Sequence, residues 1–185
     1  MSRKTPSPRR PPASERKTAR RRWNTTKCRG ELSEHAFVYK AASLGFGLAK
    51  PYSEGERFDF ILISRGWPEG DKLWRIQVKS TRAFLWDLYR VMAQRRSAGR
   101  WVTYLPTEID FIVAHVVPED SWFVIPIQSV TGRMNLFFSP KAKPQKRNLD
   151  QYREAWDLLR PPKNGKTHVG MRPDPPSGAR LRRPL

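Results

Sequence analysis

The sequence of 185 residues has one cysteine, three histidines and no long apolar run. The single thiol, Cys28, excludes an internal disulfide and a zinc site built from several thiolates. No apolar stretch reaches the length needed to span a bilayer. The basic N-terminus has no apolar segment after it, which argues against a secretory signal. We therefore expect a cytoplasmic protein with no membrane partner.

The sequence is equally poor in the patterns of common catalytic sites. His35, His115 and His168 are scattered, and no pair has the spacing of a zinc site. No motif indicates Ser-His-Asp catalysis. These residues therefore do not indicate a site.

Positive charge is what the sequence has in excess. It has 36 Lys and Arg against 17 Asp and Glu, a formal net charge of +19 with a pI near 10.9. Residues 1–22 have nine basic residues and one acid, a net charge of +8. Residues 161–185 have six basic residues and one acid, a net charge of +5, so residues 23–160 carry the remaining +6. Such an excess favours a polyanionic partner, nucleic acid before membrane. We expect the protein to associate with the nucleoid.

The composition also predicts the domain boundaries. The length fits one domain with extra tails. Residues 1–22 lack apolar content and contain four prolines, so we expect a disordered basic arm rather than the amphipathic helix of a transit peptide. This arm either tracks DNA or only improves solubility. Residues 23–160 form the domain, and residues 161–185 are a second disordered tail, basic and rich in proline.

Hydrophobic periodicity predicts a helix over residues 31–44 that Gly45 ends, and an antiparallel hairpin of strands 58–64 and 73–80. The run 111–117 predicts a buried strand. This order indicates an α/β or α+β domain with a central mixed sheet flanked by helices. The other predicted elements are strands at 47–51, 122–127 (at an edge or with a bulge, because of Pro126) and 134–138, a loop or hairpin within 82–104, a helical turn capped by Thr107, and an amphipathic helix at 150–159.

The strand Leu73–Ser80 is the centre of the predicted site. Gln77 and Lys79 share one face of this strand, because successive side chains point to opposite sides. Asp59 adds an acid at the head of the preceding strand. An amide, an ammonium and a carboxylate held side by side suit a phosphate and a metal ion.

Glu34 is the acid of interest on the predicted helix. Phe37, Val38 and Ala41 follow it at helical spacing and form an apolar stripe. A carboxylate beside a buried stripe needs a cation, a metal ion or water as its partner. A glutamate at the rim of the stripe that reaches into solvent is the alternative.

These residues form an ordered pattern along the chain. This pattern resembles the PD-(D/E)XK nuclease superfamily, closest to its group I intron-encoded (homing) branch and also similar to archaeal Holliday-junction resolvases. The resemblance covers residues 27–81 and continues more weakly from Tyr104 to Pro126. It implies a restriction-endonuclease-like core. It rests on Lys27, Gly30, Glu34, Gly45-Phe46, Arg57-Phe58-Asp59 and Gln77-Val78-Lys79-Ser80-Thr81.

Two positions depart from the family's pattern. Gln77 stands where the second acidic residue of the motif is usual, and Phe58 stands where a proline is frequent. An amide oxygen is still a hard ligand that suits Mg²⁺. However, the change removes one negative charge from a metal site, so metal affinity should fall.

The resemblance implies metal-assisted hydrolysis of DNA phosphodiesters. Asp59, Gln77 and the Val78 carbonyl would hold Mg²⁺, for which Mn²⁺ can substitute. Lys79 would orient the attacking water or neutralise the phosphate, and Glu34 would reach the metal through water or steady Lys79. The catalytic set is then Glu34, Asp59, Gln77 and Lys79, and the residues expected to contact the DNA backbone are Lys27, Arg57 and Arg82.

The expected partner is double-stranded or junction DNA, and homing, restriction and junction resolution remain open. One site cuts one strand, so we expect a homodimer or homotetramer. Two other readings compete with a nuclease. One is a non-catalytic nucleic-acid binder that keeps the fold, which the amide of Gln77 favours. The other is a ribosome- or nucleoid-associated basic protein, which gives no reason for Glu34 on an apolar stripe.

Overall fold

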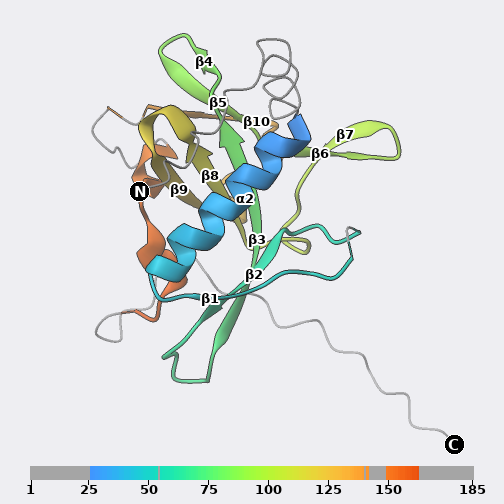
Figure 1. The fold of residues 1–185 in the computed structure, drawn as a ribbon. Helices are drawn as coiled ribbons and strands as arrows, with labels where there is room; N and C mark the ends of the chain where they lie inside the picture. The colour runs from blue at the N-terminus through green and yellow to red at the C-terminus, as the bar shows by residue number, and fades with distance from the viewer. Residues whose placement is uncertain (1–25, 54, 140, 142–148, 163–185) are drawn as a thin grey trace, which may run out of the picture.

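The computed structural model describes residues 26–53, 55–139, 141 and 149–162. Their centre is a five-stranded mixed sheet with the strand order β1-β2-β3-β8-β9 (Figure 1). A three-stranded sheet of order β10-β5-β4 and a two-stranded sheet of β6 and β7 accompany it. The predicted α/β class with a mixed sheet is confirmed. The predicted disordered tails lie outside the described residues, apart from residues 161 and 162.

The elements are α2 (Thr26–Ser43), β1 (Gly47–Ala49), β2 (Phe60–Ser64), β3 (Lys72–Thr81), β4 (Phe84–Leu85), β5 (Leu88–Met92), β6 (Gln94–Ser97), β7 (Arg100–Thr103), β8 (Phe111–Val116), η1 (Val117–Glu119), β9 (Ser121–Pro126), η2 (Ile127–Ser129), β10 (Asn135–Phe138), η3 (Leu149–Tyr152) and η4 (Trp156–Leu159). Here η denotes a 3₁₀ helix. Within the described ranges, α2 is the only α-helix. None of the helices in these ranges has the length and apolar character needed to cross a membrane.

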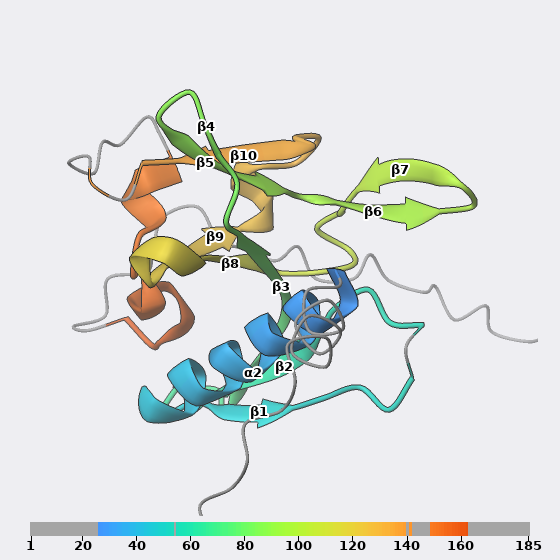
Figure 2. The same cartoon turned by 45° about the horizontal axis from the view of Figure 1, so that its top comes forward.

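Helix α2 covers one face of the large sheet, and the β10-β5-β4 sheet covers the other (Figure 2). On the helix side, Phe37 and Ala41 are fully buried against β2 and β3, and the ring of Phe37 lies 5.2 Å from that of Phe60. On the other side, Leu136 and Phe138 of β10 pack on β8 and β9. A small sheet therefore takes the place of the helix expected on this face.

The first helix begins earlier than its periodicity predicts, at Thr26, and ends where predicted. Gly45 has a φ of 83°, and its N–H donates to the Ala42 carbonyl at 2.9 Å. The Phe46 N–H reaches back to the Ala41 carbonyl at 3.1 Å. This pair of hydrogen bonds ends a helix with a glycine in the left-handed conformation, which glycine adopts at little cost.

The predicted hairpin is present, since β2 pairs antiparallel with β3 in a register that sets Phe60 opposite Ile76. Strand β8 pairs parallel with β3, and all six of its residues are buried. Parallel neighbours need a crossover connection. Here the crossover is the segment between β3 and β8, which forms the β4–β5 and β6–β7 hairpins. As predicted from Pro126, β9 lies at the edge of the sheet.

The predicted amphipathic helix at residues 150–159 is wrong. Two 3₁₀ turns, η3 and η4, occupy this region. Between them Glu154 has a φ of 49°, and its N–H donates to the Trp122 carbonyl at 2.7 Å. Its carboxylate accepts from the Trp122 N–H at 3.0 Å. The chain thus hydrogen-bonds to the free edge of β9, and this tertiary pairing overrides the helical periodicity.

The helical turn predicted near residue 107 forms with a different cap. The Ile109 N–H donates to the Leu105 carbonyl at 3.2 Å. The Leu105 N–H donates to Glu108 Oε2 at 3.1 Å, so the turn is closed by Glu108. Thr107 instead contributes its carbonyl, which accepts from the guanidinium of Arg75.

Candidate active site

Asp59, the residue directly before strand β2, contacts Gln77 of strand β3. Oδ2 of Asp59 accepts two hydrogen bonds, from Gln77 Nε2 at 2.6 Å and from the Val78 N–H at 2.7 Å. Nε2 of Gln77 also lies 3.4 Å from the Val78 carbonyl oxygen. The three residues predicted to hold a metal ion therefore lie within hydrogen-bonding reach of one another.

The strand geometry explains this meeting. Pairing between β2 and β3 stops at Phe60 and Ile76, and the Asp59 N–H donates to the Ile76 carbonyl at 2.8 Å. The next outward-facing N–H of β3 belongs to Val78, and no strand partner reaches it on that side. The carboxylate of Asp59 takes the place of the missing backbone acceptor. A side chain that completes a strand edge in this way is held rigidly.

Gln77 and Lys79 lie on the face of β3 that turns away from α2, as the alternation predicts. Ile76 and Val78 belong to the cluster beneath the helix. Gln77 is only 7% exposed, so its amide is a buried polar group whose hydrogen bond to Asp59 matters for stability.

Burial controls the acidity of Asp59. Removal from water raises the pKa of this carboxyl above its ordinary value of 3.8. The Val78 N–H and the positive charge of Lys79 lower the pKa but do not cancel the effect of burial, and the charge of Glu34 raises it further. A carboxylate that is costly to ionise gains from a nearby cation, which is a frequent property of functional sites.

Lys79 contacts the ring of Tyr104, a residue that was not predicted to belong to the site. Its Nζ lies 5.3 Å from the ring centre of Tyr104, whose side chain is 3% exposed. The Arg95 guanidinium lies 6.0 Å from the same ring. Both distances fit cation–π contacts, which orient a cation without neutralising it.

Glu34 comes to the site from α2. Its Oε2 accepts from Lys50 Nζ at 2.8 Å, and its side chain is 27% exposed. Glu34 and Lys50 both act electrostatically on Asp59. Of the three partners proposed for this carboxylate, the structure supplies a cation, Lys50, which the sequence analysis did not name. Helix α2 is joined to β3 by the hydroxyl of Ser33, which donates to Ser80 Oγ at 2.5 Å.

The three residues predicted to contact DNA differ in their exposure and their contacts. Lys27 is exposed in the first turn of α2, and Arg82 is exposed just after β3. Arg57 precedes the site on the chain, but its Nε lies 3.7 Å from Glu108 Oε1. Glu108 also pairs with Arg95. The side chain of Arg57 is therefore partly exposed to solvent and partly engaged by the mostly buried carboxylate of Glu108.

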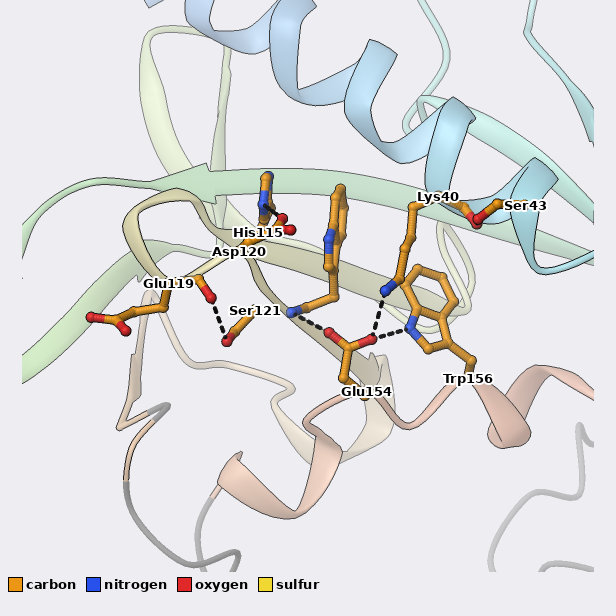
Figure 3. A network of polar contacts seen from close by, with 9 residues as sticks. Lys40, Ser43, His115, Glu119, Asp120, Ser121, Glu154 and Trp156 are labelled. Atoms are coloured by element: carbon orange, nitrogen blue, oxygen red, sulfur yellow. Dashed lines mark hydrogen bonds and ion pairs between the residues drawn. The ribbon is translucent and has the colours of Figure 1, made fainter.

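A second polar network lies on the helix side of the sheet (Figure 3). The ring of His115 stacks on Trp122 at 4.0 Å with an interplanar angle of 5°, and its Nε2 lies 3.1 Å from Asp120. The carboxylate of Glu154 forms an ion pair with Lys40 Nζ at 3.1 Å and accepts a hydrogen bond from Trp156 Nε1 at 2.8 Å. This network joins β9, α2 and η4. It contains none of the predicted site residues.

The donor set decides which metal ions the site suits. Across the described ranges, no group of three or more His, Cys, Asp and Glu residues is placed to hold a metal ion. The site instead offers one carboxylate, one amide and one backbone carbonyl, which are oxygen donors suited to Mg²⁺ or Mn²⁺ rather than zinc.

Comparison with known proteins identifies the family of the chain. A model of the PD-(D/E)XK endonuclease family matches residues 24–159. The chain belongs to the PD-(D/E)XK endonuclease family, a class of nucleases whose substrate is DNA and which generally use divalent metal ions.

Among solved structures, the chain is similar to a bacterial homing endonuclease, I-Ssp6803I. The two share 25% sequence identity with a TM-score of 0.57, and the similarity covers 73% of this chain and 91% of that one. A comparison with curated proteins gives no match.

Proposed function

We propose that this protein hydrolyses DNA phosphodiesters at the site formed by Asp59, Gln77, Val78 and Lys79, with Glu34 beside it. The observation that supports the proposal most strongly is the convergence of Gln77 and Val78 on one carboxylate oxygen of Asp59. Lys79 lowers the pKa of the same carboxyl, so its ammonium lies within electrostatic range. Membership of the PD-(D/E)XK endonuclease family supports the interpretation of this arrangement as a nuclease site.

The residues fit a magnesium ion on one condition. Oδ2 of Asp59 takes both hydrogen bonds, and within the described residues no hydrogen bond reaches Oδ1. Gln77 presents its nitrogen to Asp59, so its amide must turn to offer Oε1 instead. The terminal amide torsion is broad and roughly two-fold, but the turn breaks the hydrogen bond to Asp59, so the bound ion would have to replace that contact. Asp59, Gln77 and the Val78 carbonyl would then hold the ion.

Each residue has a distinct part in the reaction. A bound Mg²⁺ would lower the pKa of a neighbouring water and stabilise negative charge on the phosphate. The Tyr104 ring holds the ammonium of Lys79 near Asp59, where it neutralises a phosphate oxygen or orients water. Glu34 accepts a hydrogen bond from Lys50. In catalysis, the Glu34 carboxylate would leave Lys50 and bind a water near the ion.

DNA would approach through exposed basic residues. Lys27 and Arg82 contact the backbone, and Arg57 joins them when it leaves Glu108. Contacts to phosphate position the DNA without reading its sequence. Two strands require two sites, so we propose that the chain acts as a homodimer or homotetramer on double-stranded DNA. The similarity to a homing endonuclease favours cleavage of a defined duplex over a junction. We place this activity in the cytoplasm, at the nucleoid.

The competing function is a DNA-binding protein that has lost catalysis. One observation favours it: Gln77 turns its Nε2 toward Asp59, rather than the amide oxygen that a metal ion would need. Such a protein would bind DNA in chelator and show no turnover when Mg²⁺ is added.

The test is cleavage of supercoiled plasmid and of a four-way junction with Mg²⁺, with Mn²⁺ and with chelator. Lys79→Ala and Asp59→Asn should each abolish metal-dependent cutting, because one removes the cation at the phosphate and the other the charged ligand. Lys141→Ala is the matched control, since Lys141 is exposed and pairs with Glu119. Retained cutting by either site variant contradicts the proposed roles. Binding without cutting on any DNA favours the competing function.

A further inference from the structure

The β6–β7 hairpin is a narrow ribbon that pairs with no other strand of the described fold. In both views it extends away from the rest of the ribbon drawing (Figures 1 and 2). Its turn consists of Ala98 and Gly99, with φ values of 48° and 78°. Two residues with positive φ form the tight turn that suits a twisted two-stranded ribbon.

The ribbon carries positive charge and no acid. Residues 94–103 contain three arginines, no lysine and no acidic residue. Arg96 and Arg100 are exposed, and Trp101 is 50% exposed. The guanidinium of Arg96 lies 5.4 Å from the Trp101 ring, which stands directly opposite it in the ribbon. The aromatic ring therefore supports this arginine while its planar group stays open to a ligand.

The third arginine anchors the ribbon to the catalytic region. Arg95 is mostly buried, pairs with Glu108 and lies over the Tyr104 ring. Lys79 contacts the same ring. The ribbon and the catalytic lysine thus share one rigid support, which fixes the distance between them.

The alternation of the ribbon separates its side chains into two faces. The pairs Gln94–Thr103 and Arg96–Trp101 lie on one face, and Arg95, Ser97, Arg100 and Val102 lie on the other. Arginine, glutamine and threonine are residue types that bind base edges in DNA.

We infer that the β6–β7 ribbon enters the major groove of duplex DNA, where Arg96 reads a guanine and Arg100 holds a phosphate. This inference rests on the proposed function. The major groove, about 12 Å wide, admits a two-stranded ribbon, and arginine contacts O6 and N7 of guanine with two hydrogen bonds. The major groove of A-form RNA is too narrow for such side chains, so the ligand is DNA.

The other hairpin of the crossover lacks this chemistry. The tip of the β4–β5 hairpin holds Trp86 and Asp87, an aromatic residue and an acid. An acid at the tip repels the phosphates that line a groove. The ribbon of β6 and β7 is therefore the better match to the charge of DNA.

The experiment is selection of bound duplexes from a random library in chelator, so that binding is measured without cleavage. The wild type should select a motif containing guanine, and methylation at guanine N7 should interfere with binding. Arg96→Ala should lose that guanine, with about tenfold less discrimination at one position. Arg96→Lys keeps the charge but not the two-pronged contact, so it should lose the guanine and retain affinity.

Arg100→Ala should behave differently. It should weaken binding to all sequences alike and reduce the slope of log affinity against log salt by about 1. Arg133→Ala removes one exposed charge outside the ribbon and is the matched control. It should leave the selected motif unchanged.

Two results would overturn the inference: a wild type that selects no motif, or an Arg96→Ala protein that selects the wild-type motif. Neither depends on catalysis. Cleavage of plasmid DNA is scored separately with Mg²⁺, so a protein that cuts without base preference leaves the proposed function standing. If the protein selects a motif but never cuts DNA, the inference about the ribbon stands and the proposed catalysis is contradicted.

Discussion

Gln77 donates a hydrogen bond of 2.6 Å to Asp59, and the amide that departs from the family's acidic motif thereby satisfies the motif's remaining acid. A second carboxylate at position 77 would face Asp59 at close range, so the two groups would either repel each other or have to share a proton. The amide is thus compatible with a stable site in the absence of metal.

Gln77→Glu should make the protein depend on metal for stability. In chelator, loss of the donor and repulsion between two buried carboxylates should cost about 2 kcal/mol of unfolding free energy. With Mg²⁺ the added acid becomes a ligand, and the gap to the wild type should narrow. Thermal unfolding with and without Mg²⁺ measures both effects. Gln128→Glu, at an exposed position in η2, controls for added charge. An equal loss of stability with and without metal contradicts the prediction.

Asp59→Asn should stabilise the protein at neutral pH while abolishing the proposed DNA cleavage. Burial raises the pKa of Asp59, so its contribution to stability is greatest below its ordinary pKa of 3.8 and is lost as pH rises through the raised value. Asparagine carries no charge and escapes this cost. The unfolding temperature in chelator should rise by a few degrees at pH 7, and the difference should vanish near pH 3.

The control for this substitution is Asp71→Asn, since Asp71 is exposed in the turn between β2 and β3. It should show no comparable gain. If Asp59→Asn is instead less stable at pH 7, the hydrogen bonds from Gln77 and Val78 outweigh the cost of burying the charge.

Lys50→Ala should change metal binding more than stability. The pair with Glu34 is partly exposed, and such pairs contribute less than about 1 kcal/mol. Removing the ammonium frees the Glu34 carboxylate and takes a positive charge away from Asp59, so Mn²⁺ should bind more tightly. Titration followed by calorimetry measures the affinity. Unchanged affinity would show that Glu34 has no part in the metal site, and Lys141→Ala serves as the comparison.

His115→Phe should make the protein less sensitive to mild acid. Burial lowers the pKa of His115 below 6.5, against the opposing charges of Asp120 and Glu154 and with a small contribution from Arg82. The neutral ring therefore contributes stability above pH 6.5 that is lost as pH falls through the lowered pKa.

Phenylalanine keeps an aromatic ring against Trp122 but does not titrate. The wild type should lose more stability than His115→Phe between pH 7 and pH 5, as measured by denaturant midpoints. Parallel losses in the two proteins would assign the acid sensitivity to other groups.

Local sequence patterns were sufficient for much of the site. Alternation along one strand predicts that Gln77 and Lys79 share a face, and a hairpin of two short strands brings Asp59 to them. Gly45 ends the first helix because few other residues adopt its backbone conformation readily. These features depend on neighbours in the chain, so the sequence carries their signal.

Long-range contacts decided the rest. The contacts of Tyr104 with Lys79, and of Lys50 with Glu34, depend on how distant segments return to the sheet, and no local pattern marks them. The segment of residues 150–159 has a helical pattern, but Glu154 hydrogen-bonds to the edge of β9 and breaks the helix. Periodicity reports which residues prefer burial. Only the assembled sheet decides which backbone groups remain to be paired, and that pairing placed the segment of residues 150–159.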